Sequence, residues 1–373
     1  YLEVAKGFTS FAEGDVLVAK ITPCFENGKG AQATNLLNGI GFGSTEFHVI
    51  RANPDRVSAR FLYWHTRSDA FRFEGEQRMV GSAGQKRVPT EFLKQYQLAL
   101  PPLPEQQKIA AILTTVDDKL DLIARQISAT QTLKQGLMQT LFTRGAGTPD
   151  AQGRWHPHTA FQDTELGRIP VPWTMRRLGD VAPLIRRPVE IDTSLSYPEL
   201  GLRSYGKGTF HKPALLGSMV GNKRLFEIKA GDLLLSNVFA WEGAVAVANP
   251  EDDGRFGSHR YITCKVDAAL ADTRYICRYL VTPAGTDKLS LASPGGAGRN
   301  KTLGLGALAD IEIPCPSIEE QRKITMVLDS VDDKLTTLTT QQTHYQSLKR
   351  GLMQKLLTGQ WRVRVDAAAL APV

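Results

Sequence analysis

The sequence predicts an α+β fold of two similar α/β-mixed globules, separated by two long antiparallel coiled-coil helices and related by a pseudo-two-fold internal repeat. Three observations predict this architecture. Residues 105–143 and 320–358 align without a gap at an offset of 215, and 20 of their 39 paired positions are identical. Both segments carry apolar residues at helical spacing. Mixed sequence with short β-branched runs precedes each of them. A repeat of this kind indicates that one structural unit occurs twice.

Each repeated segment is predicted to form one long helix with an apolar seam, the first over 105–144 and the second over 319–358. Spacings of three and four, resumed after a polar stretch, are typical of a coiled-coil helix. The seam of the first helix is formed by Ile109, Ile112, Val116, Leu120, Ile123, Ile127, Leu133, Leu137 and Leu141. The seam of the second is formed by Ile324, Val327, Val331, Leu335, Leu338, Tyr345, Leu348, Leu352 and Leu356.

A long helix with one apolar stripe is unstable alone in water, so we expect the two helices to pack on each other. An antiparallel arrangement gives both helices the same environment. Gly136 and Gly351 recur inside the helices, where glycine costs about 1 kcal/mol relative to alanine. They indicate either close approach of another backbone or a helix end or kink. The Val-Asp-Asp-Lys-Leu steps at 116–120 and 331–335 indicate either a solvated charged face or a docking surface for another protein.

The sequence before each helix is predicted to fold into a globule of short strands and small helices. The two globules share a Gly-Asp step, at Gly14-Asp15 and Gly231-Asp232, and a later Gly-rich loop. The expected organisation is a first globule at 1–104, a linker at 145–172, a second globule at 173–318 and a tail at 359–373. Because far fewer residues precede Gly14 than separate Trp173 from Gly231, we expect the first globule to be incomplete at its N-terminus.

Composition and charge narrow the class of protein. The chain is 42% hydrophobic and 22% charged, which is ordinary for a globular protein, and it has no apolar run long enough for a membrane span. Its net charge of +7 permits an anionic partner such as nucleic acid. The scattered cysteines form no Cys-x-x-Cys pair, so we expect reduced thiols in a cytoplasmic protein. These cysteines are Cys24, Cys264, Cys277 and Cys315.

Three local patterns resemble chemical motifs but lack a required part. Residues 201–208 nearly match a phosphate-binding P-loop, but glycine follows Lys207 where Ser or Thr would ligate magnesium. The Glu-Ile-Lys step at 227–229 resembles part of a nuclease site and has no counterpart in the other copy. His156 and His158 lie in the linker without clustered ligands. We therefore expect no catalytic residue and no metal site in this chain.

Several motifs together carry a family resemblance. Leu-Pro-Pro-Leu-Pro-Glu-Gln-Gln-Lys-Ile at 100–109 has an echo at 313–324, and Leu-Lys-Gln/Arg-Gly-Leu-Met-Gln occurs at 133–139 and 348–354. The second globule opens with Leu-Gly-Arg-Ile-Pro, Trp173 and Leu-Gly-Asp-Val. This pattern resembles the specificity subunit of type I restriction–modification systems. The resemblance covers nearly the whole chain and departs from the family at the short first globule.

The resemblance implies that each globule is a target-recognition domain that reads one half of a split site in double-stranded DNA. The helices would set the spacing of the half-sites and dock two modification subunits, which methylate adenine. Two restriction subunits, translocases with nuclease activity, would complete the complex. The family's specificity subunit performs no chemistry and carries no cofactor. S-adenosylmethionine, ATP and magnesium are expected in the partner subunits.

Two alternatives remain open from the sequence alone. The chain could be the recognition portion of a fused restriction–methylation enzyme, or a protein-interaction scaffold that does not bind DNA. If it binds DNA, phosphates would be contacted by Lys, Arg and turn amides, and bases by Arg, Asn, Gln, Lys, Ser or Thr. Loops rich in these residues supply the candidates, although each loop is also compatible with an ordinary solvated turn and Trp241 with a core position. The candidates are Thr22, Gly84, Gln85, Lys86, Arg87, Arg203, Ser204, Tyr205, Lys207, Asn237, Trp241, Arg299, Asn300 and Lys301.

Overall fold

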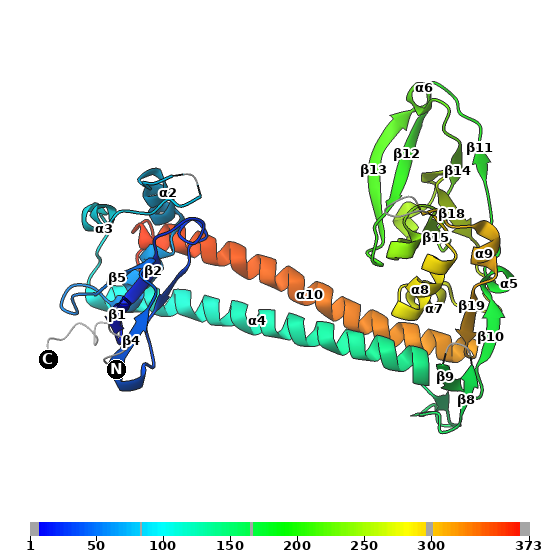
Figure 1. The fold of residues 1–373 in the computed structure, drawn as a ribbon, viewed down its shortest axis with the longest axis horizontal. Helices are drawn as coiled ribbons and strands as arrows, with labels where there is room; N and C mark the ends of the chain where they lie inside the picture. Colours follow the sequence, from blue (N-terminus) through cyan, green and yellow to red (C-terminus); the bar gives the residue numbers. More distant parts are fainter. Residues whose placement is uncertain (1–6, 83, 165–166, 296–300, 366–373) are drawn as a thin grey trace. The chain divides into compact units, whose positions relative to one another are not determined.

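The computed structural model describes residues 7–82, 84–164, 167–295 and 301–365 (Figure 1). The chain divides into two compact units, the first of residues 1–128 with 336–373 and the second of residues 129–335. Each unit contains a globule and part of both long helices, α4 (Leu103–Arg144) and α10 (Ile318–Leu357). The predicted fold class is therefore confirmed. Within the described ranges, no helix combines the length and the hydrophobicity needed to cross a membrane.

The globule of the first unit contains two small antiparallel sheets and short helices. Strand β2 (Val16–Ala19) lies between β3 (Gly30–Gln32) and β5 (Phe47–Ile50), and β1 (Thr9–Ala12) pairs with β4 (Ile40–Gly43). The helices are η1 (Leu37–Gly39), α1 (Ala59–Thr66), α2 (Asp69–Gln77) and α3 (Thr90–Gln95). The core combines alternate residues of β2, aromatic residues of α2 and α3, Phe25 on the turn after β2 and Val88 just before α3. It consists of Val16, Val18, Phe25, Phe71, Val88 and Phe92.

The globule of the second unit repeats this central sheet and adds a larger one. Strand β15 (Leu233–Ser236) lies between β16 (Val245–Val247) and β18 (Tyr261–Cys264), as β2 lies between β3 and β5. The larger sheet has the order β11-β14-β17-β12-β13, in which β12 and β13 form a long antiparallel hairpin (Figure 1). Its strands are β11 (Pro188–Val189), β14 (Leu225–Glu227), β17 (Phe256–Ser258), β12 (Ser196–Leu202) and β13 (Thr209–Leu216).

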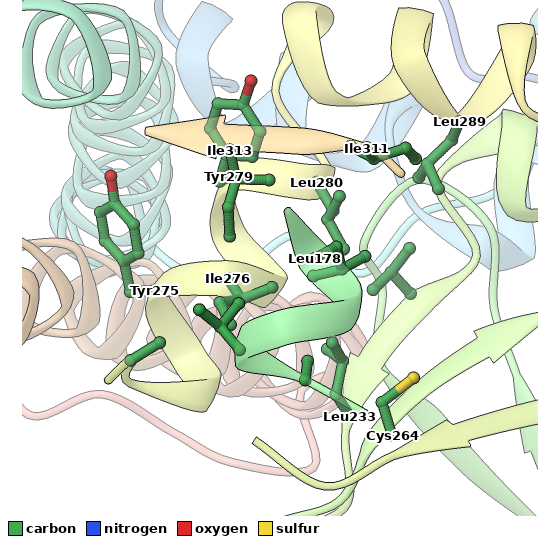
Figure 2. Close-up of a cluster of buried hydrophobic side chains, with 14 of the residues drawn as sticks. Leu178, Leu233, Cys264, Tyr275, Ile276, Tyr279, Leu280, Leu289, Ile311 and Ile313 are labelled. Atoms are coloured by element: carbon green, nitrogen blue, oxygen red, sulfur yellow. The ribbon is translucent and has the colours of Figure 1, made fainter. Parts of the chain in front are cut away.

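The remaining elements of the second unit are short. Strand β10 (Thr174–Arg177) pairs with β19 (Glu312–Cys315). The short helices are α5 (Leu178–Val181), α6 (Gly217–Val220), η2 (Ala240–Glu242), η3 (Pro250–Asp252), α7 (Thr273–Leu280), α8 (Pro283–Leu291) and α9 (Leu305–Ala309). Figure 2 shows how the apolar face of α7 packs against α5, β15 and β18. Burial raises the pKa of the Cys264 thiol to about 12, which keeps this core cysteine protonated and unreactive.

The shared Gly-Asp step starts the central strand of each globule. Gly14 and Gly231 have φ values of +86° and +85°, a conformation that glycine adopts without strain. The aspartate that follows is buried and accepts two hydrogen bonds from an arginine. Asp15 pairs with Arg51 at 2.8 and 2.7 Å, and the Asp232 carboxylate is held in the same way by an arginine that precedes β11. The motif therefore forms the same turn twice, with partners from different parts of the chain.

A buried glutamine ties the start of α4 to the globule of the first unit. The backbone N–H of Ser58 donates to Gln106 Oε1 at 2.9 Å. Gln106 Nε2 donates to the carbonyls of Arg56 at 2.9 Å and Pro101 at 2.8 Å. All three contacts involve backbone groups, so they hold the helix whatever side chains the globule carries.

The corresponding glutamine of α10 makes the same contacts in the second unit. The backbone N–H of Asp272 donates to Gln321 Oε1 at 2.8 Å. Gln321 Nε2 donates to the carbonyls of Pro316 at 3.0 Å and Leu270 at 3.4 Å. In both copies the glutamine thus bonds the carbonyl of the proline that lies five residues before it.

The glutamate beside each glutamine binds the chain that leaves the other long helix. Glu320 accepts hydrogen bonds from the backbone N–H groups of Ala146 and Gly147 and from Trp173 Nε1, at 2.9 to 3.0 Å, and lies 3.0 Å from His158 Nε2. Residues 145–172, which the sequence predicts to be a linker, therefore fold against the second unit. They form the hairpins β6–β7 and β8–β9, with strands Thr148–Pro149, Trp155–His156, Phe161–Thr164 and Gly167–Pro170.

The equivalent contact in the first unit involves the residues after α10. Glu105 accepts a two-pronged hydrogen bond from the Arg362 guanidinium, with distances of 2.8 and 2.7 Å, and a further one from the Val363 backbone N–H at 2.9 Å. The helix start in each unit is therefore closed onto the end of the other helix.

The two helices run antiparallel within each unit. In the first unit Lys349 bonds Asp117, and in the second unit Lys134 bonds Asp332 at 2.6 Å. These are equivalent pairs at the repeat offset of 215. Interhelical ion pairing therefore replaces the predicted solvated or docking face at the first aspartate of each Val-Asp-Asp-Lys-Leu step. The following aspartate and lysine are exposed in both copies.

Two further predictions for the helices are wrong. Leu133 and Leu348 are 52% and 43% exposed and do not belong to the seam, where the buried Thr130 lies instead. The reason is that the 3.6-residue helical period moves them off the packed face. Gly136 and Gly351 lie within continuous helix, and a Cβ on either would meet no atom within 4 Å. Close backbone approach therefore does not explain these glycines, and neither does a helix end.

Candidate nucleic-acid interface

In the second unit the fold brings two predicted clusters together at the tip of the β12–β13 hairpin. The backbone N–H of Tyr205 donates to the Glu242 carbonyl at 2.8 Å, and that of Gly206 donates to the Gly243 carbonyl at 2.8 Å. The Ser204 hydroxyl donates to the Glu242 carboxylate at 2.9 Å. The hairpin tip, residues 203–208, is therefore fastened to the turn that contains Trp241.

Cationic and aromatic side chains meet at this tip. Lys207 Nζ lies 5.7 Å from the centre of the Tyr205 ring. The Arg203 guanidinium lies 4.9 Å from the centre of the Phe210 ring and donates to the Thr209 carbonyl. Strand β13 follows directly, so the P-loop resemblance of this segment has no helix to complete a phosphate site.

A third predicted cluster joins through the Gly-rich loop. Lys301 Nζ lies 4.9 Å from the centre of the Trp241 ring and donates to Ser290 Oγ at 3.1 Å. The Leu303 backbone N–H donates to the Asn237 carbonyl at 2.8 Å. The Asn237 side-chain oxygen is buried and has no partner within the described part of the chain. The other candidates of this loop, Arg299 and Asn300, lie outside the described residues.

Trp241 itself occupies a fixed, half-buried position. Its Nε1 donates to the Val238 carbonyl at 3.0 Å, and the Lys301 ammonium covers its ring. The sequence leaves a DNA contact and a core position open for this residue. In the structure its ring supports the Lys301 ammonium.

In the first unit the corresponding turn and loop also meet. The Thr22 backbone N–H donates to the Lys86 carbonyl at 2.9 Å, and its hydroxyl donates to Glu26 Oε1 at 2.6 Å. Gly84, Gln85 and Lys86 are exposed on this loop. The fold therefore assembles the same two segments in both globules.

Arg87 is used differently from its neighbours. Its guanidinium donates two hydrogen bonds to the Glu46 carboxylate, both at 2.9 Å. This pairing lowers the pKa of Glu46 and raises that of Arg87. Because both groups stay charged and paired, Arg87 braces the loop, while Gln85 and Lys86 are exposed to solvent.

The braces Glu46 and Ser290 were missed by sequence reasoning. Glu46 lies 41 residues before Arg87 and Ser290 lies 11 residues before Lys301, and no local pattern marks either residue. Elsewhere His156 pairs with Asp150 and His158 with Glu320. The described ranges contain no group of three or more His, Cys, Asp or Glu side chains placed to hold a metal ion.

Comparisons with known proteins agree with this geometry. A family model described as type I restriction modification DNA specificity domain matches residues 3–131 and 170–346. The EcoAI specificity subunit of Escherichia coli is 43% identical over 139 residues, which cover 37% of this chain and 24% of that protein. The putative MjaX specificity subunit of Methanocaldococcus jannaschii is 25% identical over 328 residues, covering 85% of this chain and 71% of that protein.

Solved structures show the same fold. The crystal structure of the type I restriction–modification S subunit from M. genitalium matches 94% of this chain and 84% of its own, with a TM-score of 0.55 and 15% sequence identity. The match to the E. coli relative covers about a quarter of that protein's length. The chain spans most of the M. genitalium structure.

Proposed function

Because the chain belongs to the family of type I restriction modification DNA specificity domains, we propose that it selects the DNA sequence for a type I restriction–modification complex. Each globule reads one half of a bipartite site in double-stranded DNA. The paired helices set the separation of the half-sites. Since the two globules differ in sequence, the two halves need not be related by symmetry, unlike the sites of homodimeric readers.

The observation that carries this proposal is the repeated construction of the loop clusters. In the first globule the Gly-rich loop is hydrogen-bonded through Lys86 to Thr22, on the turn after the central strand. In the second globule Leu303, just after the corresponding loop, is hydrogen-bonded to Asn237 on the corresponding turn. Lysines can contact phosphates and amide or hydroxyl groups can contact base edges. The candidates for these contacts are the fourteen residues predicted from the sequence, with Arg87 and Trp241 in supporting positions.

The proposed partners follow from the same family. Two modification subunits would bind along the helices and carry S-adenosylmethionine, and two restriction subunits would carry ATP and magnesium. The chain itself would contribute recognition without catalysis. The relatives are named as specificity subunits, which favours this role over a fused enzyme or a scaffold that does not bind DNA.

Mapping of methylated adenines by single-molecule sequencing tests the proposal. DNA from cells that express this chain with its modification subunit is expected to carry a motif of two short parts at constant spacing. Gln85→Ala is expected to relax only one part and Asn300→Ala only the other, because amide side chains can read base edges. A continuous motif, or methylation that does not depend on this chain, would overturn the proposal.

A further inference from the structure

We propose that Tyr205 stacks on a DNA base within the half-site read by the second globule. This inference rests on the proposed function of that globule and goes beyond it by assigning a contact of a particular kind. The ring would pack against a base that is not fully stacked in the duplex. Three features of the hairpin tip carry the inference: the backbone conformation of Tyr205, the bracing of the tip and the cations around the ring.

The backbone conformation of Tyr205 is unfavourable for a tyrosine. Its φ is +62°, in the left-handed region that favours glycine and asparagine. Gly206 and Gly208, which also have positive φ, suit the turn. The Tyr205 side chain is 72% exposed, so little burial offsets its strain. A strained, exposed aromatic residue that gains so little stability is placed for contact with a ligand.

The hairpin tip is held firmly beneath the ring. The backbone N–H groups of Tyr205 and Gly206 are both bonded to carbonyls of the adjoining turn at 2.8 Å. A Cβ on Gly206 would lie 3.2 Å from Val281 Cγ1, which shows how closely the tip approaches the end of α7. A ring presented by a fixed backbone loses little conformational entropy when it binds.

The charges around the ring suit a polyanion. Lys207 lies beside Tyr205, and Arg203 is held over Phe210 on the same turn. The neighbouring carboxylate of Glu242 is engaged by Ser204. These cations can contact phosphates on either side of a base that meets the ring. Trp241 is the weaker stacking candidate, because it is half-buried, its Nε1 is bonded to Val238 and the Lys301 ammonium over its ring is bonded to Ser290.

A base available for stacking is consistent with the chemistry proposed for the partner. Enzymes that modify a base in a duplex take it out of the stack, which disturbs the neighbouring base steps. An aromatic side chain stabilises an unstacked base whatever its identity, because every base has a π-face. Tyr205 would thereby lower the cost of opening the half-site.

The test uses the full chain assembled with its modification subunits and a duplex that carries the mapped motif. Tyr205→Asn keeps a residue that tolerates positive φ, so the turn should fold and the melting temperature should be unchanged or higher. Its affinity for the duplex should fall roughly 5- to 150-fold. Tyr205→Phe keeps the ring and should bind like the wild type. The salt dependence of binding should not change in either variant, whereas Lys207→Ala should reduce the slope by about one.

Fluorescence of 2-aminopurine at successive positions of the half-site provides a direct readout. At one position the signal should depend on the ring, being alike for wild type and Tyr205→Phe and different for Tyr205→Asn. Equal affinity and equal fluorescence for all three proteins would overturn the stacking assignment while leaving the proposed function intact. If the wild-type complex shows no preference for its motif, the proposed function fails instead.

Discussion

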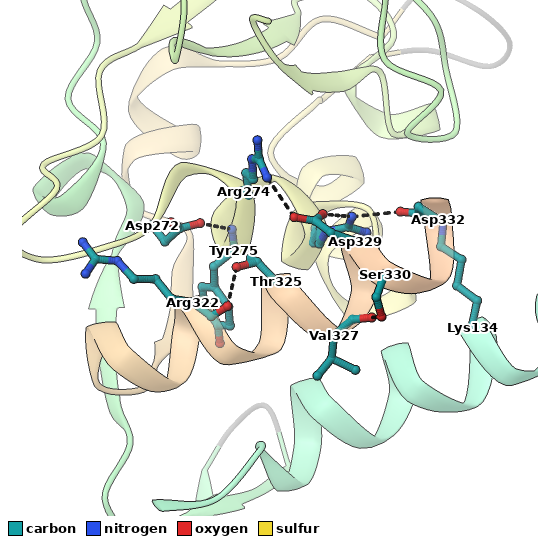
Figure 3. A network of polar contacts seen from close by, with 11 residues as sticks. Lys134, Asp272, Arg274, Tyr275, Arg322, Thr325, Val327, Asp329, Ser330 and Asp332 are labelled. Atoms are coloured by element: carbon teal, nitrogen blue, oxygen red, sulfur yellow. Dashed lines mark hydrogen bonds and ion pairs between the residues drawn. The ribbon is translucent and has the colours of Figure 1, made fainter. Parts of the chain in front are cut away.

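The two units join globule to helix at corresponding places but with different chemistry. In the second unit α7 presents arginines to aspartates of α10 (Figure 3). Arg278 donates to Asp329 at 2.5 Å and to Asp332 at 2.8 Å, and Arg274 donates to Asp329 at 2.8 Å. Burial acts to lower the pKa of Arg278, but the hydrogen bonds with both aspartates outweigh it and raise that pKa. The junction is a partly buried ion-pair network.

In the first unit the equivalent helix α1 has no such network among its described contacts. Arg60 Nε and Trp64 Nε1 both donate to Thr114 Oγ1, at 3.1 and 3.3 Å. Lys349 Nζ lies 4.9 Å from the centre of the Trp64 ring. Trp64 is fully buried, so this junction depends on apolar packing, one hydroxyl and a cation–π contact.

The difference shows which part of the junction must be common to both units. Thr114 and Asp329 occupy equivalent positions, and so do Trp64 and Arg278. In the first unit Trp64 donates to Thr114, and in the second unit Arg278 donates to Asp329. The glutamine contacts to backbone groups are the same in both. Backbone contacts therefore fix the geometry of the helix start. The side chains at the junction can differ between the units, provided that the globule residue and the helix residue of one unit can bond each other.

Breaking the ion-pair network should have the largest effect. Arg278→Ala removes the charged hydrogen bonds to Asp329 and Asp332 but leaves them Arg274 and Lys134 as partners, so we expect a loss of about 3 kcal/mol in the second unit. Amide hydrogen exchange of the full chain should show lost protection in α7 and unchanged protection in α1. Arg274, whose side chain is 66% exposed, provides the matched control. Arg274→Ala should cost less than about 1 kcal/mol, and equal effects of the two variants would contradict this account.

Acid should weaken the first unit through a residue that the second unit lacks. His65 is buried with no partner for Nε2 within the described residues, and burial lowers its pKa from 6.5 to about 4. Because the unfolded chain binds this proton more readily, stability should fall as the pH drops from 6.5 and level off below 4. The full penalty is about 3 kcal/mol.

The replacement His65→Tyr, which installs the residue found at the equivalent position 279, checks this prediction. Tyrosine is larger, so a constant difference in stability from repacking is possible at every pH. The informative quantity is therefore the change in that difference with pH, measured by chemical denaturation. The variant should gain about 3 kcal/mol relative to wild type between pH 7 and pH 4. Parallel stability curves would exclude His65 as the source.

The smallest effect concerns a feature that the units share. Gly136→Ala and Gly351→Ala should each stabilise the chain by about 0.5 to 1 kcal/mol, because a Cβ meets open space at both positions and alanine favours the helix. Thermal unfolding measures the gain. A gain that disappears when the modification subunit is bound would indicate that the partner approaches these glycines, and a loss in the free chain would contradict the structure.

The sequence predicted part of the candidate nucleic-acid interface. Matching of the repeat paired Thr22 with Asn237 and placed a Gly-rich loop in each globule. Within each globule the structure joins the turn to the loop region by a backbone hydrogen bond, between Thr22 and Lys86 in the first and between Asn237 and Leu303 in the second. The contact between the hairpin tip and η2 could not be predicted, because Tyr205 lies on the turn between β12 and β13, whereas Glu242 lies between β15 and β16 of a different sheet. The structure also assigns Arg87 to the Glu46 pair, which no local pattern marks.

The amino-acid sequence by itself determined the duplication, the two helices and their antiparallel pairing. These follow from periodicity and from identical residues at a constant offset, both of which can be read from the order of residues alone. Only the tertiary structure decided which face of each helix is buried at Leu133 and Leu348, and which polar groups join globule to helix. Those outcomes depend on contacts between residues distant in sequence. Packing geometry decides which residues meet, and the local pattern of residues does not contain that information.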